Sequence, residues 1–134
     1  MWRSLVAVFG GWLAIQFLVV ITDGIFARIF PGQYGAGLPA PAWLTGLRLA
    51  CGVLYTVFGG WLAVLLAPER PWRHALYLIV LGETMGILTA GMSIGLLPFW
   101  YLGGLLLLFP VAVLAGAWLR LRGAGQGSSD RPAV

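Results

Sequence analysis

The sequence predicts an all-α fold, specifically an integral membrane four-helix bundle. Of the 134 residues, 60% are hydrophobic and only 9% are charged, whereas soluble domains carry roughly 25% charged residues. Apolar runs recur along the chain, and each approaches the roughly 20 residues that one membrane crossing needs. Short polar or Gly/Pro-rich segments separate these runs. Four crossings therefore use nearly the whole chain.

The four helices form one transmembrane domain, residues 1–119. They are expected at residues 4–23, 43–67, 74–96 and 98–119. The first apolar run continues to Thr22 without a small-residue cleavage site, so we interpret it as a retained helix and not as a signal peptide. Residues 120–134 are Gly/Ser-rich and are predicted to form a disordered cytoplasmic tail.

Arginines indicate the orientation, because cytoplasmic loops carry an excess of positive residues. Six arginines lie on one side of the membrane, namely Arg3, Arg70, Arg73, Arg120, Arg122 and Arg131. Only Arg28 lies in a loop on the other side. Both termini are therefore expected in the cytoplasm, and the protein in the inner (plasma) membrane of a bacterium. Trp43, Trp100 and Tyr101 are expected to anchor the outer helix ends.

Several classes of function find no support in the sequence. The eight basic residues are all arginines, placed singly or in pairs near helix ends, and this pattern does not indicate nucleic-acid binding. Cys51 is the single cysteine and His74 the single histidine, so neither an internal disulfide nor a metal-ligand cluster is expected. No cofactor motif is present.

Asp23 and Arg48 are the first pair of candidate site residues. Counting 1.5 Å per residue from the inner helix ends places both near the outer interface. An ion pair between them is expected, with Arg28 as an alternative partner for Asp23. We interpret the pair mainly as a clip between the first two helices, with a binding role as the alternative.

Glu83 is the second candidate, because it lies near the middle of the third helix, where a charged group is costly. No basic residue shares its depth, so the carboxyl is expected to hydrogen-bond to a hydroxyl or carbonyl group. Glu83 and Tyr55 are the candidate catalytic residues, and a structural strut is the alternative role of Glu83. The candidate binding residues are Arg48, Asp23, Gln16, Thr84 and Thr89.

Small residues and one repeat predict close helix packing. Residues 8–14 and 57–63 both read Val-Phe-Gly-Gly-Trp-Leu-Ala. The two copies lie at similar depth on helices of opposite direction, which favours coincidence or a shared packing need over gene duplication. Ridges of small residues on the second and third helices are expected to pack within the bundle, although a homo-oligomer or a larger partner would use them equally.

The second half of the chain resembles the DoxX-like superfamily of small four-helix membrane proteins of bacteria. The resemblance rests on the pattern Leu47-Arg48-x-x-x-Gly52-x-x-Tyr55-x-x-x-Gly59, on the following arginine-bearing turn, and on Trp100-Tyr101. It covers residues 45–118, and Glu83 has no counterpart in it. Because members of that superfamily often act as subunits of redox complexes, the resemblance implies a partner more than a catalytic activity.

Three functions are compatible with these residues. The first is a non-catalytic subunit or assembly factor of a larger membrane complex, suggested by the small-residue faces and the absence of catalytic motifs. The second is an intramembrane enzyme or lipid-binding protein that uses Glu83 on a hydrophobic substrate. The third is a proton-coupled transporter of small molecules that depends on the same carboxyl group. The expected partners are lipid, a larger complex or a second copy of the chain.

Overall fold

The computed structural model describes residues 2–34, 40–66 and 69–126. Within these ranges the chain forms α1 (Trp2–Ile29), α2 (Ala42–Leu66), α3 (Pro71–Met92) and α4 (Phe99–Gln126). All four helices are long and apolar enough to cross a membrane by length and composition. The predicted all-α class with four membrane-spanning helices is therefore confirmed, and the chain is a multi-pass membrane protein.

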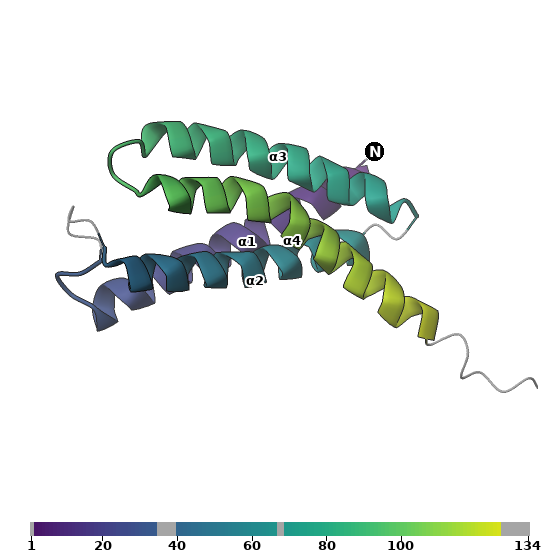
Figure 1. The fold of residues 1–134 in the computed structure, drawn as a ribbon. Coiled ribbons are helices and arrows are strands. Elements are labelled where there is room, and N and C mark those ends of the chain that lie inside the picture. The colour runs from purple at the N-terminus through teal and green to yellow at the C-terminus, as the bar shows by residue number, and fades with distance from the viewer. Residues whose placement is uncertain (1, 35–39, 67–68, 127–134) are drawn as a thin grey trace, which may run out of the picture.

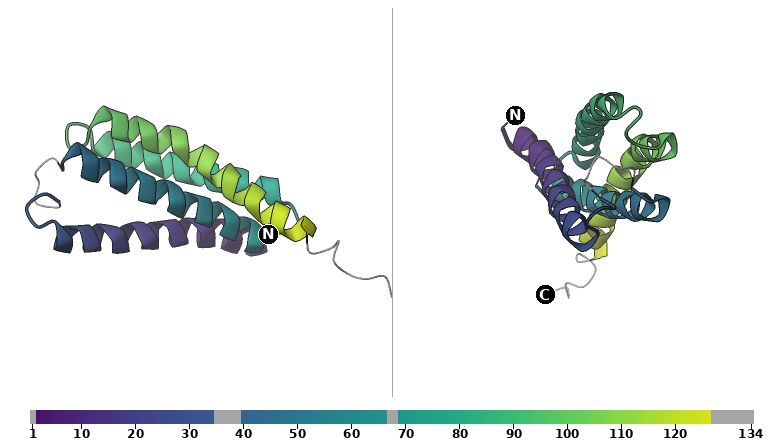
Figure 2. Two further views of the ribbon diagram at one scale, coloured as in Figure 1. Left: turned by 60° about the horizontal axis from the view of Figure 1, so that its bottom comes forward. Right: turned by 90° about the vertical axis from the view of Figure 1, so that its left-hand side faces the viewer.

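The helices alternate in direction along one bundle (Figure 1). We call the end at which α1 and α3 begin the basal end, and the opposite end, with the α1–α2 and α3–α4 connections, the apical end. Figure 2 shows α1 beside α2 and α3 beside α4. Two helices therefore point each way.

Three helices have boundaries that differ from the prediction. α1 continues past Asp23 to Ile29, because Asp23 is paired across the bundle and does not end the helix. α3 is shifted towards the basal end: Pro71 occupies its first position, where proline is tolerated, and the helix stops at Met92. α4 continues to Gln126, so residues 120–126 are helical and not the start of a disordered tail. The rest of the predicted tail lies outside the described residues.

The basal half of the bundle holds the apolar core, to which every helix contributes. Its buried members are Val8, Ala63, Val64, Ala75, Leu78, Val113 and Ala117. Most of these side chains are small or β-branched, which lets the helices come close together. In lipid, such contact packing must replace the hydrophobic drive that holds soluble bundles together.

The repeated heptapeptide forms the crossing of α1 and α2. A Cβ atom on Gly11 would lie 2.8 Å from the carbonyl oxygen of Gly59, and a Cβ on Gly59 would lie 2.9 Å from the carbonyl oxygen of Gly11. The two backbones therefore touch reciprocally where antiparallel helices cross. This geometry supports a shared packing need as the explanation of the repeat.

A bend divides α4 into two parts, and α2 contacts both of them. Pro110 lies inside the helix, and the axis changes direction there (Figure 1), as expected where a proline removes a backbone hydrogen bond. Before the bend, Phe109 packs against Gly82 of α3. After the bend, the backbone of Val113 packs against Gly60, and Gly116 packs against Val57 of α2.

The two apical turns share one design. Gly32 follows α1 and Gly95 follows α3, and each has φ +84°, a conformation that glycine adopts without steric cost. Backbone hydrogen bonds of 3.1 Å from Gln33 to Phe30 and of 3.0 Å from Leu96 to Ser93 close the turns. The first turn directs the chain back over the bundle, which brings Tyr34 to the site described below.

A matched pair of substitutions in α4 tests the glycine contacts. A Cβ at Gly116 would collide with the backbone of Val57 and lie 2.8 Å from the Trp61 nitrogen, whereas a Cβ at Gly103 meets nothing within 4 Å. Gly116→Ala should therefore lower the free energy of unfolding by about 1–3 kcal/mol, and Gly103→Ala should change it by less than about 0.5 kcal/mol. Circular dichroism during denaturant titration in detergent measures both. Equal stability of the two variants would contradict this packing.

Candidate functional site

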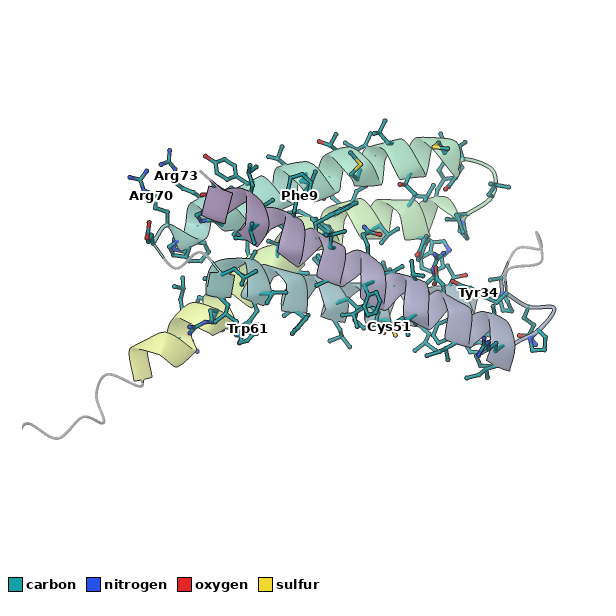
Figure 3. The ribbon with its side chains drawn as sticks, turned by 180° about the vertical axis from the view of Figure 1, so that it is seen from behind. Phe9, Tyr34, Cys51, Trp61, Arg70 and Arg73 are labelled. Atoms are coloured by element: carbon teal, nitrogen blue, oxygen red, sulfur yellow. The ribbon has the colours of Figure 1, made fainter. Side chains whose placement is uncertain are left out.

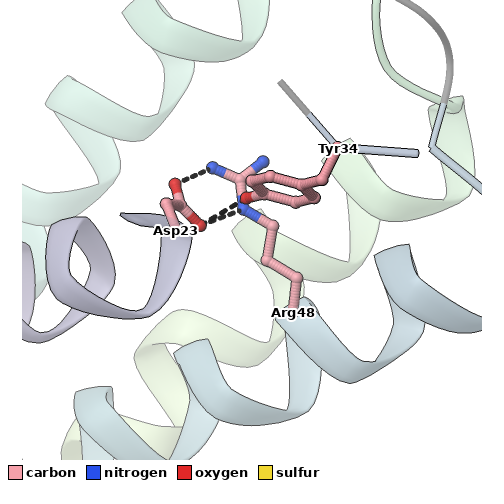
Figure 4. Close-up of polar contacts among 3 residues, drawn as sticks. All are labelled: Asp23, Tyr34 and Arg48. Carbon is pink, nitrogen blue, oxygen red and sulfur yellow. Dashed lines mark hydrogen bonds and ion pairs between the residues drawn. The ribbon is translucent and has the colours of Figure 1, made fainter. Parts of the chain in front are cut away.

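An ion pair joins α1 to α2 near the apical end (Figure 4). Arg48 donates from Nη2 to Oδ2 of Asp23 at 2.6 Å and from Nε to Oδ1 at 3.0 Å. This two-point geometry is the strongest that an arginine and a carboxylate form. The predicted Asp23–Arg48 pair is confirmed, and Arg28, the alternative partner, is exposed.

Two tyrosines enclose the ion pair. The Tyr34 hydroxyl donates to Oδ1 of Asp23, and the Arg48 guanidinium lies 5.7 Å from the ring centroids of both Tyr34 and Tyr101. Burial, followed by the hydrogen bond to Asp23, raises the pKa of the Tyr34 phenol, and Arg48 opposes the shift. Tyr101 is only 4% exposed, so its prediction as an interfacial anchor is wrong: its ring packs against the arginine.

A cavity of about 280 Å³ extends from this ion pair into the bundle, and all four helices line it. Most of its wall is apolar. Every predicted site residue except Thr84 lines it, namely Gln16, Asp23, Arg48, Tyr55, Glu83 and Thr89. Residues chosen from the sequence by depth alone therefore share one space.

The cavity opens between α1 and α3. Four of its lining residues are also exposed, and three of them border this gap: Gln16 on α1, and Met85 and Thr89 on α3. The fourth is Leu105 on α4. Figure 3 shows α1 diverging from α3 towards the apical end, where Tyr34 marks the end of the α1 turn. In a bilayer this opening faces lipid, not water.

Thr84 does not belong to the cavity lining. Its side chain is exposed, and its hydroxyl donates to the Val80 carbonyl oxygen at 2.7 Å. Neighbouring residues on a helix point about 100° apart, because one turn takes 3.6 residues. Thr84 therefore faces outward when Glu83 faces inward, and it is not part of this cavity.

Glu83 lines the cavity without a fixed partner. Its Oε1 atom is buried and forms no hydrogen bond within the described part of the chain. Tyr55, the expected neighbour, bonds elsewhere: its hydroxyl lies 2.6 Å from the Thr22 hydroxyl. The Glu83 carboxyl is therefore not tied into the bundle as a structural strut would be.

Sequence reasoning missed Trp12 as a lining residue. Its Nε1 atom is buried, and it also lacks a hydrogen-bond partner among the described residues. Trp12 lies next to Gly11 in the repeated heptapeptide, and that position drew attention to its packing, not to its polar atom. A count of depth along α1 would have placed it near the level of Glu83.

Within residues 2–34, 40–66 and 69–126, no three His, Cys, Asp or Glu side chains come together as a metal site.

Comparisons with known protein families, with curated proteins and with solved structures find no match for the chain. The DoxX-like resemblance therefore stays a prediction.

The ion pair should stabilise the apical end, and one substitution tests this. Arg48→Met leaves the Asp23 carboxylate and the Tyr34 hydroxyl in a site where the paired side chains are only 27% and 28% exposed. We expect a loss of about 1–3 kcal/mol in the free energy of unfolding, the cost of an unmade bond to a charged group. Arg28→Met is the control and should change stability by less than about 0.5 kcal/mol.

Unfolding in detergent, followed by circular dichroism, compares the two variants. The exchange Asp23→Arg with Arg48→Asp should recover part of the loss, because it restores opposite charges at the same place. If Arg48→Met were as stable as Arg28→Met, the pair would not act as a clip.

Proposed function

We propose that this protein binds a small, mostly apolar molecule inside the membrane, in the cavity between its four helices. The observation that carries the proposal is the Glu83 carboxyl, which lines that cavity with a buried oxygen that has no partner in the described chain. Small-molecule sites combine mostly apolar walls with a few placed polar groups. This cavity has that composition and lies near the lower end of their usual size range.

The energetic cost of Glu83 supports a ligand role. A carboxylate near the bilayer centre costs about 2.5–3.5 kcal/mol, and a structural role would normally offset this cost through a hydrogen bond across helices. Asp23 and Arg48 show how this bundle satisfies charged groups that hold helices together. Glu83 has no such arrangement, which favours an interaction that forms only with a ligand.

Binding is favoured over catalysis and transport. Catalysis by acid and base needs two groups within hydrogen-bond reach of the reacting atoms, but the Tyr55 hydroxyl is bonded to Thr22 and not directed to Glu83. A proton-coupled transporter would use the same carboxyl group and cavity, and no further feature favours it. We rank these two functions below binding.

A subunit of a larger membrane complex is the second proposal. The small-residue faces suggest it from the sequence, but Gly59, Gly60, Gly82 and Gly86 pack against residues of the same chain. What still favours it is Gly91 at the apical end of α3, where a Cβ would meet nothing within 4 Å. This exposed small-residue face could receive a neighbouring helix.

Purification in mild detergent followed by native mass spectrometry separates these proposals. We expect the wild-type chain to retain a small lipid-soluble molecule, and Glu83→Ala to lose it. Glu69→Ala, at an exposed carboxylate, is the matched control and should keep the adduct. A stoichiometric partner protein in place of the adduct would favour the subunit, and recovery of the bare chain would overturn the binding proposal.

We further propose that the basal end lies in the cytoplasm, at the inner membrane of a bacterium. Arg70 and Arg73 are exposed at the basal end (Figure 3), and the positive-inside rule assigns such a surface to the cytoplasm. Both termini of the chain would then be cytoplasmic.

Cysteine labelling in intact bacterial cells tests this orientation. In a Cys51→Ala background, Gln33→Cys at the apical end should react with a membrane-impermeant maleimide added outside. Glu69→Cys at the basal end should react only after permeabilisation; both positions are exposed. The reverse pattern would show that the orientation is inverted.

A further inference from the structure

Two buried polar atoms on facing helices of the cavity lack a hydrogen-bond partner among the described residues. They are Nε1 of Trp12 on α1 and an oxygen, Oε1, of Glu83 on α3, and both residues line the cavity. The indole N–H can only donate, whereas a carboxyl oxygen accepts. Buried polar groups in native proteins are nearly always paired, so an orphaned donor and an orphaned acceptor in one cavity need an explanation.

The two groups lie at similar depth. α1 begins at Trp2 and α3 at Pro71, both at the basal end. At 1.5 Å per residue, Trp12 lies about 15 Å along α1 and Glu83 about 18 Å along α3. The helices touch beside Trp12 and about 7.5 Å below Glu83, where a Cβ on Gly11 would lie 3.4 Å from Cδ2 of Leu78. Because both side chains are long and line the same cavity, we infer that one small head group can reach both.

We propose that the ligand is a lipophilic molecule with a hydroxyl head group, held between Trp12 and Glu83. This inference rests on the proposed binding function and specifies the chemistry of the ligand. A hydroxyl accepts from the indole N–H and donates to the carboxyl oxygen at the same time. While Oε1 accepts, an ether or ketone, which can only accept, would leave this oxygen unpaired. An ammonium group, which can only donate, would leave the indole N–H unpaired.

The surroundings fit the rest of such a ligand. Ile15, Leu102 and Phe109 line the cavity and offer apolar contacts to its body. The opening between α1 and α3 gives access from lipid, where a lipophilic molecule concentrates. Neighbouring side chains shield both polar atoms, so the two side chains turn towards the ligand on binding. Their terminal torsions are broad, which makes such a turn easy.

Three probes that differ only in head group test the inference. They are 2-naphthol, which donates and accepts, 2-methoxynaphthalene, which accepts, and naphthalene, which does neither. Equilibrium dialysis compares phosphatidylcholine nanodiscs that contain the protein with nanodiscs that do not. The difference corrects the measured binding for partitioning of the probe into lipid. We expect 2-naphthol to bind about tenfold more tightly than 2-methoxynaphthalene, and naphthalene to bind most weakly, in keeping with the loss of one hydrogen bond at each step.

Variants assign each step to one side chain. Glu83→Leu should reduce the affinity for 2-naphthol to that for 2-methoxynaphthalene. Trp12→Phe should weaken both by about tenfold and leave naphthalene unchanged. Glu69→Leu and Trp72→Phe, at exposed positions, should bind all three probes as the wild type does. If a variant does not fold, the order of the three probes on the wild-type chain still decides the question.

The outcomes distinguish failure of the hydroxyl inference from failure of the proposed binding function. If all three probes bind equally well above the empty nanodiscs, the cavity binds apolar molecules and the hydroxyl inference is wrong. If no probe binds above the empty nanodiscs, both the hydroxyl inference and the proposed binding function are overturned. Tighter binding of 2-naphthol that persists in Glu83→Leu would place the head group elsewhere.

Discussion

Backbone contact on both sides of α2 constrains the rest of the bundle. Two adjacent glycines make these contacts, since Gly59 meets the backbone of α1 and Gly60 meets the backbone of α4. Apolar side chains gain little by leaving lipid for another apolar surface, so helix association in a membrane depends on such close approach. Because these contacts lie towards the basal end, they hold three helices together there and leave the apical half free to differ in shape.

The apical half adds polar contacts to its apolar packing, and most of the cavity lining lies in it. Here α1 and α2 are joined through the side chains of Asp23 and Arg48 and not through backbone contact. Tyr34 and Tyr101 enclose the guanidinium. α4 contacts α2 on both sides of the bend at Pro110, through Gly104 before it and through Gly116 after it. Tight packing and an open cavity thus coexist because they occupy different levels of one bundle.

The sequence predicted the fold and the depth of each residue in the membrane well. It predicted poorly which face of its helix a residue occupies. Apolar runs predicted four helices, and residue counts brought Asp23 level with Arg48, because both follow from a fixed rise per residue. Thr84 was misplaced because depth does not tell which face a residue occupies. Tyr34 reaches Asp23 through a turn at Gly32, and Tyr101 reaches Arg48 from α4. Neither contact could be predicted from the spacing of apolar residues along the sequence.

The unequal helix lengths have a consequence for the surrounding bilayer. α1 and α4 have 28 residues each and α3 has 22, which corresponds to about 42 Å and about 33 Å, against a hydrocarbon layer of about 30 Å. α3 fits this layer almost upright, whereas α1 either tilts or extends its arginine-bearing ends into the head-group region. The two helices that border the opening of the cavity therefore meet the bilayer differently, and a change in membrane thickness would act on α1 more than on α3.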